Sequence, residues 1–189
     1  MSSEQKATGF RIELRLAPSE TGQRELKSWP ATSFTPDFAV AASGTVRLEL
    51  AGQMIGTKDH KLMSVETRLA QRLQEDINFW LPDYVGGFAL GLGRALQTLR
   101  ERAPQSRAKF MDEPLALQFR RQSPTATTIM VGFEADGKGI RMAEVPEAVL
   151  YAEASRALQA FRRQLLDLNP ELARQQDVLE LSQLIQKLA

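Results

Sequence analysis

Hydrophobic and polar residues alternate with a period of two near the start of the chain, which predicts a strand over residues 10–16. Residues 17–36 contain prolines and a glycine among polar residues, a composition typical of a connection over the protein surface. The alternation returns at residues 38–40 and 46–50, and the Ala-Ser-Gly segment between them predicts the turn of an antiparallel hairpin. The first part of the chain is therefore expected to form three strands.

The spacing of apolar residues then changes to three or four, which predicts a helix over residues 62–80. Ser64 is placed to cap this helix and Pro82 to stop it. A second helix is predicted over residues 83–102, because Pro104 follows an apolar stripe of helical spacing.

Three more strands are predicted in the second half of the chain. Residues 105–114 are polar and basic, and the alternation resumes at residues 115–119. Residues 127–133 and 140–145 form the next two strands, and the Asp-Gly-Lys-Gly turn at 136–139 tolerates the positive φ angles of a tight hairpin.

The C-terminal part predicts two helices. A continuous apolar stripe runs through residues 146–168, and Pro146 stands where a first helical residue is favoured. Asn169, Pro170 and Glu171 then supply an N-cap, a first helical residue and an acidic first turn for a helix that reaches residue 188.

The predicted order is βββααβββαα, an α+β fold. We expect one antiparallel meander sheet of about six strands, in two sets of three, covered on one face by about four helices. One domain over residues 1–189 is expected, with a flexible N-terminus at residues 1–8. Because both halves share one plan, the alternative is a pseudo-repeat of residues 9–103 and 113–189.

Composition removes several classes of function. The chain has no cysteine and a single histidine, His60, which excludes disulfide scaffolds, zinc fingers and iron–sulfur sites. No cofactor is expected. The net charge of +1 argues against a protein built mainly to coat nucleic acid or anionic lipid. The longest apolar stretch, residues 84–93, is too short to span a membrane, and the polar N-terminus predicts a cytoplasmic location. The 17 arginines against 7 lysines hint at a GC-rich bacterial genome.

Asp59 and His60 are the candidate catalytic pair, because a neighbouring carboxylate can orient an imidazole as a general base. Further acidic residues surround the helix predicted over 62–80, but their spacing matches no dedicated metal loop. We favour the interpretation that these acidic residues are solvated surface side chains. A metal-assisted or acid-base enzyme with a site near Asp59 and His60 is the alternative function.

Segment 94–121 has the largest charge asymmetry, with seven basic against three acidic residues, a local balance of +4. Such a segment could neutralise phosphates, which makes weak nucleic-acid binding a second alternative. Only two aromatic residues, Phe110 and Phe119, are available to stack on bases. A surface that faces another protein is preferred, and nucleic acid is not expected as a partner. The seven basic residues are Arg94, Arg100, Arg102, Arg107, Lys109, Arg120 and Arg121.

Two further features suggest contact with a partner. Trp29 lies in a long connection, where a tryptophan either tucks into the core edge or anchors a partner. The C-terminal helix has an apolar face wide enough either to be sandwiched or to pair in a homodimer. The candidate partner-binding residues are Trp29, Arg100, Arg102, Arg107, Lys109, Leu181 and Ile185.

The function predicted first is a non-catalytic cytoplasmic protein-binding or adaptor protein of bacterial type. Its architecture is similar to that of small bacterial proteins that bind another protein, including immunity proteins of toxin systems. No motif identifies a family.

Overall fold

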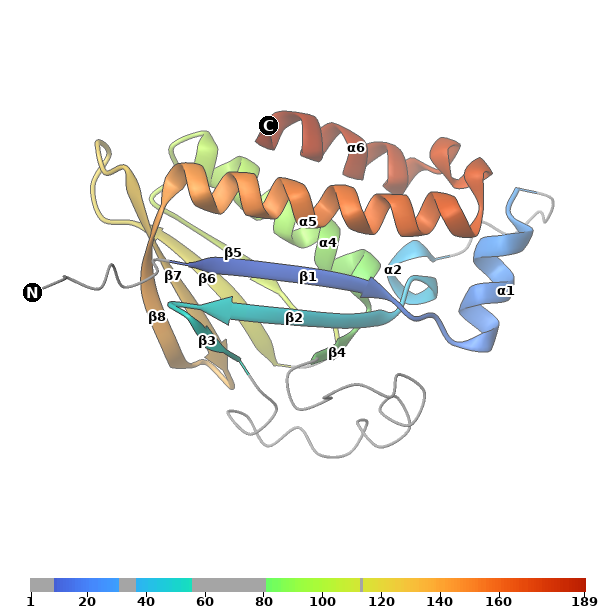
Figure 1. The fold of residues 1–189 in the computed structure, drawn as a ribbon, viewed down its shortest axis with the longest axis horizontal. Helices are drawn as coiled ribbons and strands as arrows, with labels where there is room; N and C mark the ends of the chain where they lie inside the picture. The colour runs from blue at the N-terminus through green and yellow to red at the C-terminus, as the bar shows by residue number, and fades with distance from the viewer. Residues whose placement is uncertain (1–8, 31–36, 56–80, 113) are drawn as a thin grey trace, which may run out of the picture.

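The computed structural model describes residues 9–30, 37–55, 81–112 and 114–189. The described strands form two antiparallel sheets, and helices α5 and α6 lie above the strands in the view of Figure 1. In chain order the elements are β1 (Phe10–Leu16), α1 (Glu20–Ser28), α2 (Phe38–Ala41), β2 (Gly44–Leu50), β3 (Gln53–Met54), β4 (Leu81–Asp83), α4 (Val85–Arg100), β5 (Gln105–Lys109), β6 (Leu115–Arg121), β7 (Thr128–Ala135), β8 (Lys138–Pro146), α5 (Glu147–Leu168), the 3-10 helix η3 (Pro170–Arg174) and α6 (Gln176–Leu188).

The first sheet, sheet A, is centred on β2. β1 pairs with β2 along its whole length, from Phe10 opposite Leu50 to Leu16 opposite Gly44. β3 and β4 pair with opposite ends of β2, so both lie on the side of β2 that faces away from β1. Within this sheet β1 and β2 are separated along the chain by helices α1 and α2, whereas β2 and β3 follow one another directly.

The second sheet, sheet B, is a meander in the order β5-β6-β7-β8. Asp136 and Gly137 both have positive φ angles, 50° and 73°, which is the conformation of the two-residue turn that joins twisted antiparallel strands. The predicted hairpin over residues 127–145 is confirmed. Along β6 and β7, mostly apolar side chains that belong to the core alternate with outward residues that include Gln118, Arg120 and Glu134, so one face of this sheet forms part of the core.

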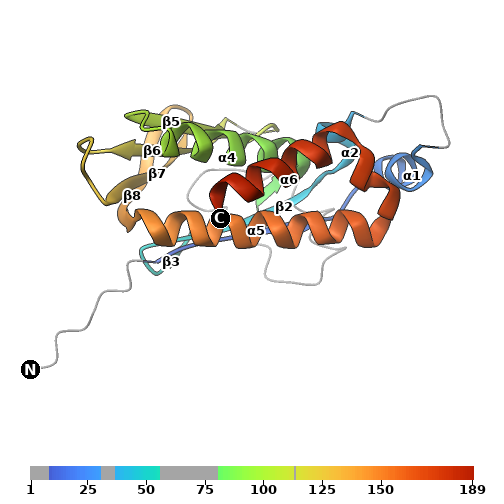
Figure 2. The same cartoon turned by 90° about the horizontal axis from the view of Figure 1, so that it is seen from above.

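Helix α4 occupies the middle of the molecule. Its apolar side chains belong to one contiguous cluster of buried side chains that also includes residues of both sheets and of α5 and α6. Figure 2 shows α4, α5 and α6 next to one another in a helical layer. Of the helices that the structure describes, none combines the length and the apolar character needed to cross a membrane.

Helix α5 also covers the edge of β1 that is not paired with β2. Glu153 Oε1 accepts a hydrogen bond from the Ile12 amide at 3.2 Å, and Arg156 donates to the Ile12 carbonyl at 2.9 Å. Gln164 accepts from the Leu16 amide at 2.8 Å and donates to the Leu14 carbonyl at 2.9 Å. These side chains take the place of a further strand, which protects an edge that could otherwise pair with another chain.

The α+β class and the antiparallel pairing are confirmed, but the single six-stranded meander is wrong. The strands form two four-stranded sheets, and the order of elements differs from βββααβββαα. The hairpin predicted over residues 38–50 is wrong, because residues 38–41 form helix α2 and β2 pairs with the distant β1. Asp37 begins α2, since its carboxylate accepts a hydrogen bond from the Ala39 amide at 3.2 Å.

Two segments taken as connections contain regular structure. Residues 17–36 include helix α1, which buries only Gly22 and Leu26 and therefore carries little apolar periodicity. Residues 105–114 include β5, whose core-facing positions hold the small residues Ser106 and Ala108. Neither segment has the regular repeat of large apolar side chains on which the sequence prediction depended.

The remaining predicted elements are found with shifted ends. Strands at 10–16, 115–119 and 127–145 are present, and the second predicted helix is α4. The helix predicted over residues 62–80 lies outside the described residues. The C-terminal helix begins later than expected, because η3 follows Asn169 and α6 starts at Gln176.

Candidate functional site

The outward face of sheet B is the candidate site, and we call it the open face. It points away from the helical layer, because the alternate, inward side chains of the same strands pack into the core. Strand pairing places its residues in rows that cross the sheet. One row runs from β5 to β8 in the order Arg107, Gln118, Gly132 and Met142. The open face carries Gln105, Arg107, Lys109, Ala116, Gln118, Arg120, Met130, Gly132, Glu134, Met142 and Glu144. Of these, Ala116 and Gly132 are buried by their neighbours.

Two methionines form the apolar part of the open face. Met142 lies opposite Gly132 across the β7–β8 pair, and the residue is 60% exposed. Met130 lies opposite Glu144 in the adjacent row, so it is a diagonal neighbour of Met142. Gly132 is buried between Gln118 and Met142, and a Cβ atom at this position would lie 3.6 Å from Met142 Cγ and 3.8 Å from Gln118 Cβ. The exposed apolar surface of this face is therefore mainly the Met142 side chain.

Charged side chains surround this apolar part. Arg107 forms an ion pair with Glu134, with Nη2 and Oε2 2.8 Å apart, and Gln118 also donates a hydrogen bond to Glu134. Lys109 and Arg120 are exposed on β5 and β6, and no carboxylate partner is found for either among the described residues. The basic side chains therefore lie at the β5–β6 side, and Glu144 lies on β8, on the opposite side of the sheet.

Two predicted basic residues lie away from this face, at the end of α4. Arg100 lies over the Tyr151 ring, 5.4 Å from its centroid, and donates to the Lys187 carbonyl at 2.5 Å. Arg102 follows α4 with a φ of 71° and donates to the Pro124 carbonyl at 3.3 Å. Both side chains are thus held by contacts between elements, although both residues are exposed.

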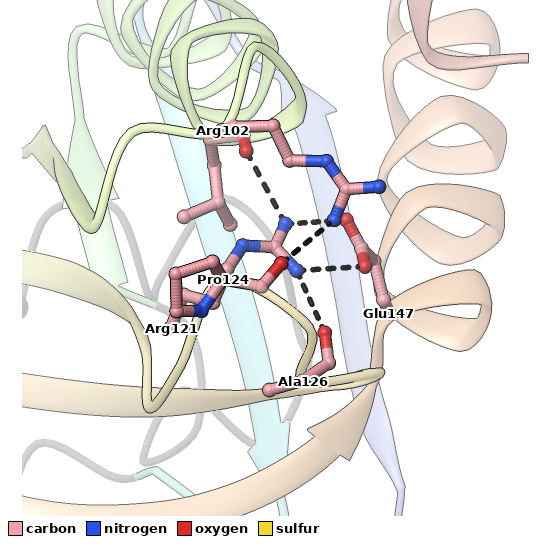
Figure 3. A network of polar contacts seen from close by, with 6 residues as sticks. Arg102, Arg121, Pro124, Ala126 and Glu147 are labelled. Atoms are coloured by element: carbon pink, nitrogen blue, oxygen red, sulfur yellow. Dashed lines mark hydrogen bonds and ion pairs between the residues drawn. The ribbon is translucent and has the colours of Figure 1, made fainter.

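Arg121 points into the core and is held by Glu147, as Figure 3 shows. Its guanidinium makes two hydrogen bonds to the Glu147 carboxylate, at 2.6 and 2.9 Å, and further bonds to the Ala126 and Leu99 carbonyls. The Arg121 hydrogen bond holds the pKa of Glu147 below its usual value. Burial raises the pKa of the neighbouring Tyr151 hydroxyl to about 12. This cluster joins β6 to α5, and we assign it to the stability of the fold.

The predicted basic segment 94–121 is therefore divided among several environments. Arg94 pairs with Glu180 on α6 at 2.6 Å, Arg107 pairs with Glu134, and Arg121 pairs with Glu147. Three of the seven cations are thus balanced within the chain, which leaves fewer to neutralise phosphates.

Trp29 lies at the edge of the core. Its side chain is half-buried and packs against the main apolar cluster. The Asn169 side chain donates to the Trp29 carbonyl and to the Leu26 carbonyl, both at 2.8 Å, and so ties the end of α1 to the end of α5. The Trp29–Pro30 peptide bond is cis.

The structure buries the two candidate residues of the C-terminal helix. Leu181 has no exposed surface and Ile185 has 7%, because α6 packs against α4 and α5. Leu179 is the exposed large apolar residue of α6, at 47%. The wide apolar face of this helix is thus covered within one chain, which corresponds to the sandwiched alternative.

Asp59 and His60 lie outside the described residues. Asp83, an acidic residue that follows the helix predicted over 62–80, is buried and accepts hydrogen bonds from the Met111 and Asp112 amides at 2.8 and 2.9 Å. Burial raises the pKa of its carboxyl from 3.8 to about 6. Within the parts of the chain that the structure describes, no cluster of three or more acidic or histidine side chains could hold a metal ion.

The structure brings Arg107 and Lys109 together with residues that the sequence argument did not select. Met130 and Met142 are the main omissions. The alternation over residues 127–145 already places both methionines on the other face of the sheet from the core-facing Val131 and Phe133. A methionine at an outward strand position was the available signal.

Comparisons of the chain with protein-family models, with curated proteins and with solved structures give no match.

Proposed function

We propose that the chain is a non-catalytic protein-binding module that recognises its partner through the open face of sheet B. The observation that carries this proposal is the exposure of Met142, beside Met130, at the apolar part of a sheet face that the described helices leave uncovered. The proposal includes the role predicted from the sequence, a cytoplasmic regulatory or immunity-like partner of another bacterial protein.

The chemistry of this face suits protein recognition. Methionine side chains are flexible and polarizable, so they adapt to the shape of a partner. Methionine and arginine are enriched in protein interfaces, whose apolar centre is surrounded by a polar rim. Met142 and Met130 would form such a centre, and Arg107, Arg120 and Glu144 lie around it. A hydrogen-bonded sheet of four strands also loses little conformational freedom when it binds.

The charges define the complementary surface. Lys109 and Arg120 have no carboxylate partner among the described residues, so the partner is expected to place acidic side chains over β5 and β6. An apolar side chain of the partner would contact the exposed Met142. The proposed partner is therefore a folded protein with an apolar contact beside an acidic rim.

The test begins with capture of partners on the tagged full chain at about physiological salt. The captured protein is then purified and titrated into the chain by calorimetry. We expect a one-to-one complex that Met142→Glu weakens at least about tenfold, because one buried contact at the centre of an interface contributes that much or more.

Leu179→Glu is the matched control. It introduces the same charge in place of an exposed apolar side chain, but on α6. We expect this variant to bind as the unchanged chain does. Equal binding by the Met142 variant, or equal loss in both variants, would reject the open face as the binding surface.

A further inference from the structure

A groove runs between α5 and α6, in the helical layer rather than on the open face. Its volume is about 350 Å³, which is enough for a few side chains. It is lined by Gln159, Arg162, Arg163, Ser182, Ile185 and Gln186. No acidic side chain is present in this lining.

Arg162 is oriented by the facing helix. Its Nε donates to the Ser182 hydroxyl at 2.7 Å, and that hydroxyl in turn donates to the Val178 carbonyl at 2.7 Å. The Nε atom is thereby fixed, and the two Nη groups have no hydrogen-bond partner among the described residues. A guanidinium held in this way is preorganised to donate two parallel hydrogen bonds to one anion.

The groove has a positive charge that no described carboxylate balances. In the part of the chain that the structure describes, neither Arg162 nor Arg163 forms an ion pair. The carboxylate of Glu180, on the same helix as Ser182, is held instead by Arg94 of α4.

We propose that this groove binds an acidic peptide segment, with two carboxylate side chains on Arg162 and Arg163. Two guanidinium groups balance two singly charged carboxylates, and the neutral amides of Gln159 and Gln186 can hydrogen-bond to a peptide backbone. Ile185 supplies apolar contact for the methylene groups of acidic side chains. This site is independent of the open face, so either proposal can fail without the other.

The probe is a hexaglutamate peptide with blocked ends, titrated into the ¹⁵N-labelled full chain. We expect saturable shifts of the Arg162 Nε–Hε resonance. Replacing both arginines with glutamine is expected to weaken binding about tenfold or more, because charge-assisted hydrogen bonds are lost. Ser182→Ala leaves the net charge unchanged but removes the hydroxyl that orients the Arg162 guanidinium. We expect this variant to weaken peptide binding by a smaller factor.

Arg24→Gln is the matched control, since Arg24 is exposed on α1 and lies outside the groove lining. This variant should bind the peptide as the unchanged chain does. Three results would overturn the proposal: no saturable shift at Arg162, equal weakening by Arg24→Gln, or stronger binding of inorganic phosphate or a single-stranded oligonucleotide than of the peptide.

Discussion

Arg121 and Glu147 form a buried, two-pronged ion pair that joins the end of β6 to the first turn of α5. The Arg121 side chain is 2% exposed and that of Glu147 is 23% exposed, with the closest nitrogen and oxygen 2.6 Å apart. The guanidinium also binds the Ala126 and Leu99 carbonyls, so one cation connects four segments of the chain.

We expect Glu147→Gln to lower the free energy of unfolding by about 3 kcal/mol, because removing one partner leaves a buried charge uncompensated. Chemical denaturation measures the change. Glu171→Gln is the control, because Glu171 pairs with Arg174 on the surface, where the two side chains are 49% and 78% exposed. This variant should lose at most about 1 kcal/mol of unfolding free energy. Equal losses in the two variants would contradict a structural role for the Arg121 pair.

Asp83 is expected to give the fold an unusual pH dependence. Burial raises the pKa of its carboxyl from 3.8 to about 6, so the folded state binds a proton more tightly than the unfolded chain does. The stability that this group contributes is therefore fully present below about pH 4 and is lost as the pH rises through about 6. For Glu147 the sign is opposite, because its pKa is lowered.

The measurement is the free energy of unfolding of the unchanged chain and of Asp83→Asn between pH 4 and 8. The difference between the two isolates this one carboxyl from all other titrating groups. The unchanged chain should lose up to about 3 kcal/mol relative to the variant across this range. A difference that stays constant with pH would show that Asp83 titrates normally.

Gln164 is expected to protect the edge of β1. Gln164→Ala removes its hydrogen bonds to the Leu14 carbonyl and the Leu16 amide, and should destabilise the fold by about 1–3 kcal/mol. Hydrogen exchange should show faster exchange of the Leu16 amide. Gln183→Ala, at an exposed position of α6, should leave that amide unchanged. Unaltered protection of Leu16 in the Gln164 variant would contradict this role.

Two glycines of α4 should respond to alanine with opposite signs. A Cβ atom at Gly91 meets nothing within 4 Å, so Gly91→Ala should stabilise the protein by about 0.5–1 kcal/mol through helix propensity. A Cβ atom at Gly86 would lie 2.8 Å from the Phe38 carbonyl oxygen, so Gly86→Ala should destabilise it by about 1–3 kcal/mol. Thermal unfolding of both variants is the test, and shifts of the same sign would contradict the packing of α2 on α4.

The sequence predicted the elements in which large apolar residues recur regularly. Residues 127–145 and the helix over 146–168 are of this kind, and both were found. β5 was missed because Ser106 and Ala108 fill its inward positions, and α1 because it buries so few side chains. Local patterns also could not show that β2 pairs with β1 across two intervening helices, so two sheets were taken for one. The single domain over residues 1–189 and the repeated halves 9–103 and 113–189 stay predictions.

The candidate surface was predicted only in part. Basic residues in segment 94–121 pointed to Arg107 and Lys109, which do lie on the open face. The same charge count included Arg121, which the fold buries, and Arg94, which pairs across to α6. Charge along the sequence cannot separate these environments, because the partners come from distant segments. Whether Asp59 and His60 take part in chemistry stays a prediction.

The most direct test of the central claim uses the methionine methyl groups as reporters. The chain has six methionines, and two of them, Met130 and Met142, lie on the open face. Spectra of ¹³C-methyl methionine are recorded with and without the purified partner. We predict large shifts for Met130 and Met142 and none for Met111, which is exposed outside this face. A complex that leaves the Met130 and Met142 signals unchanged would contradict the account.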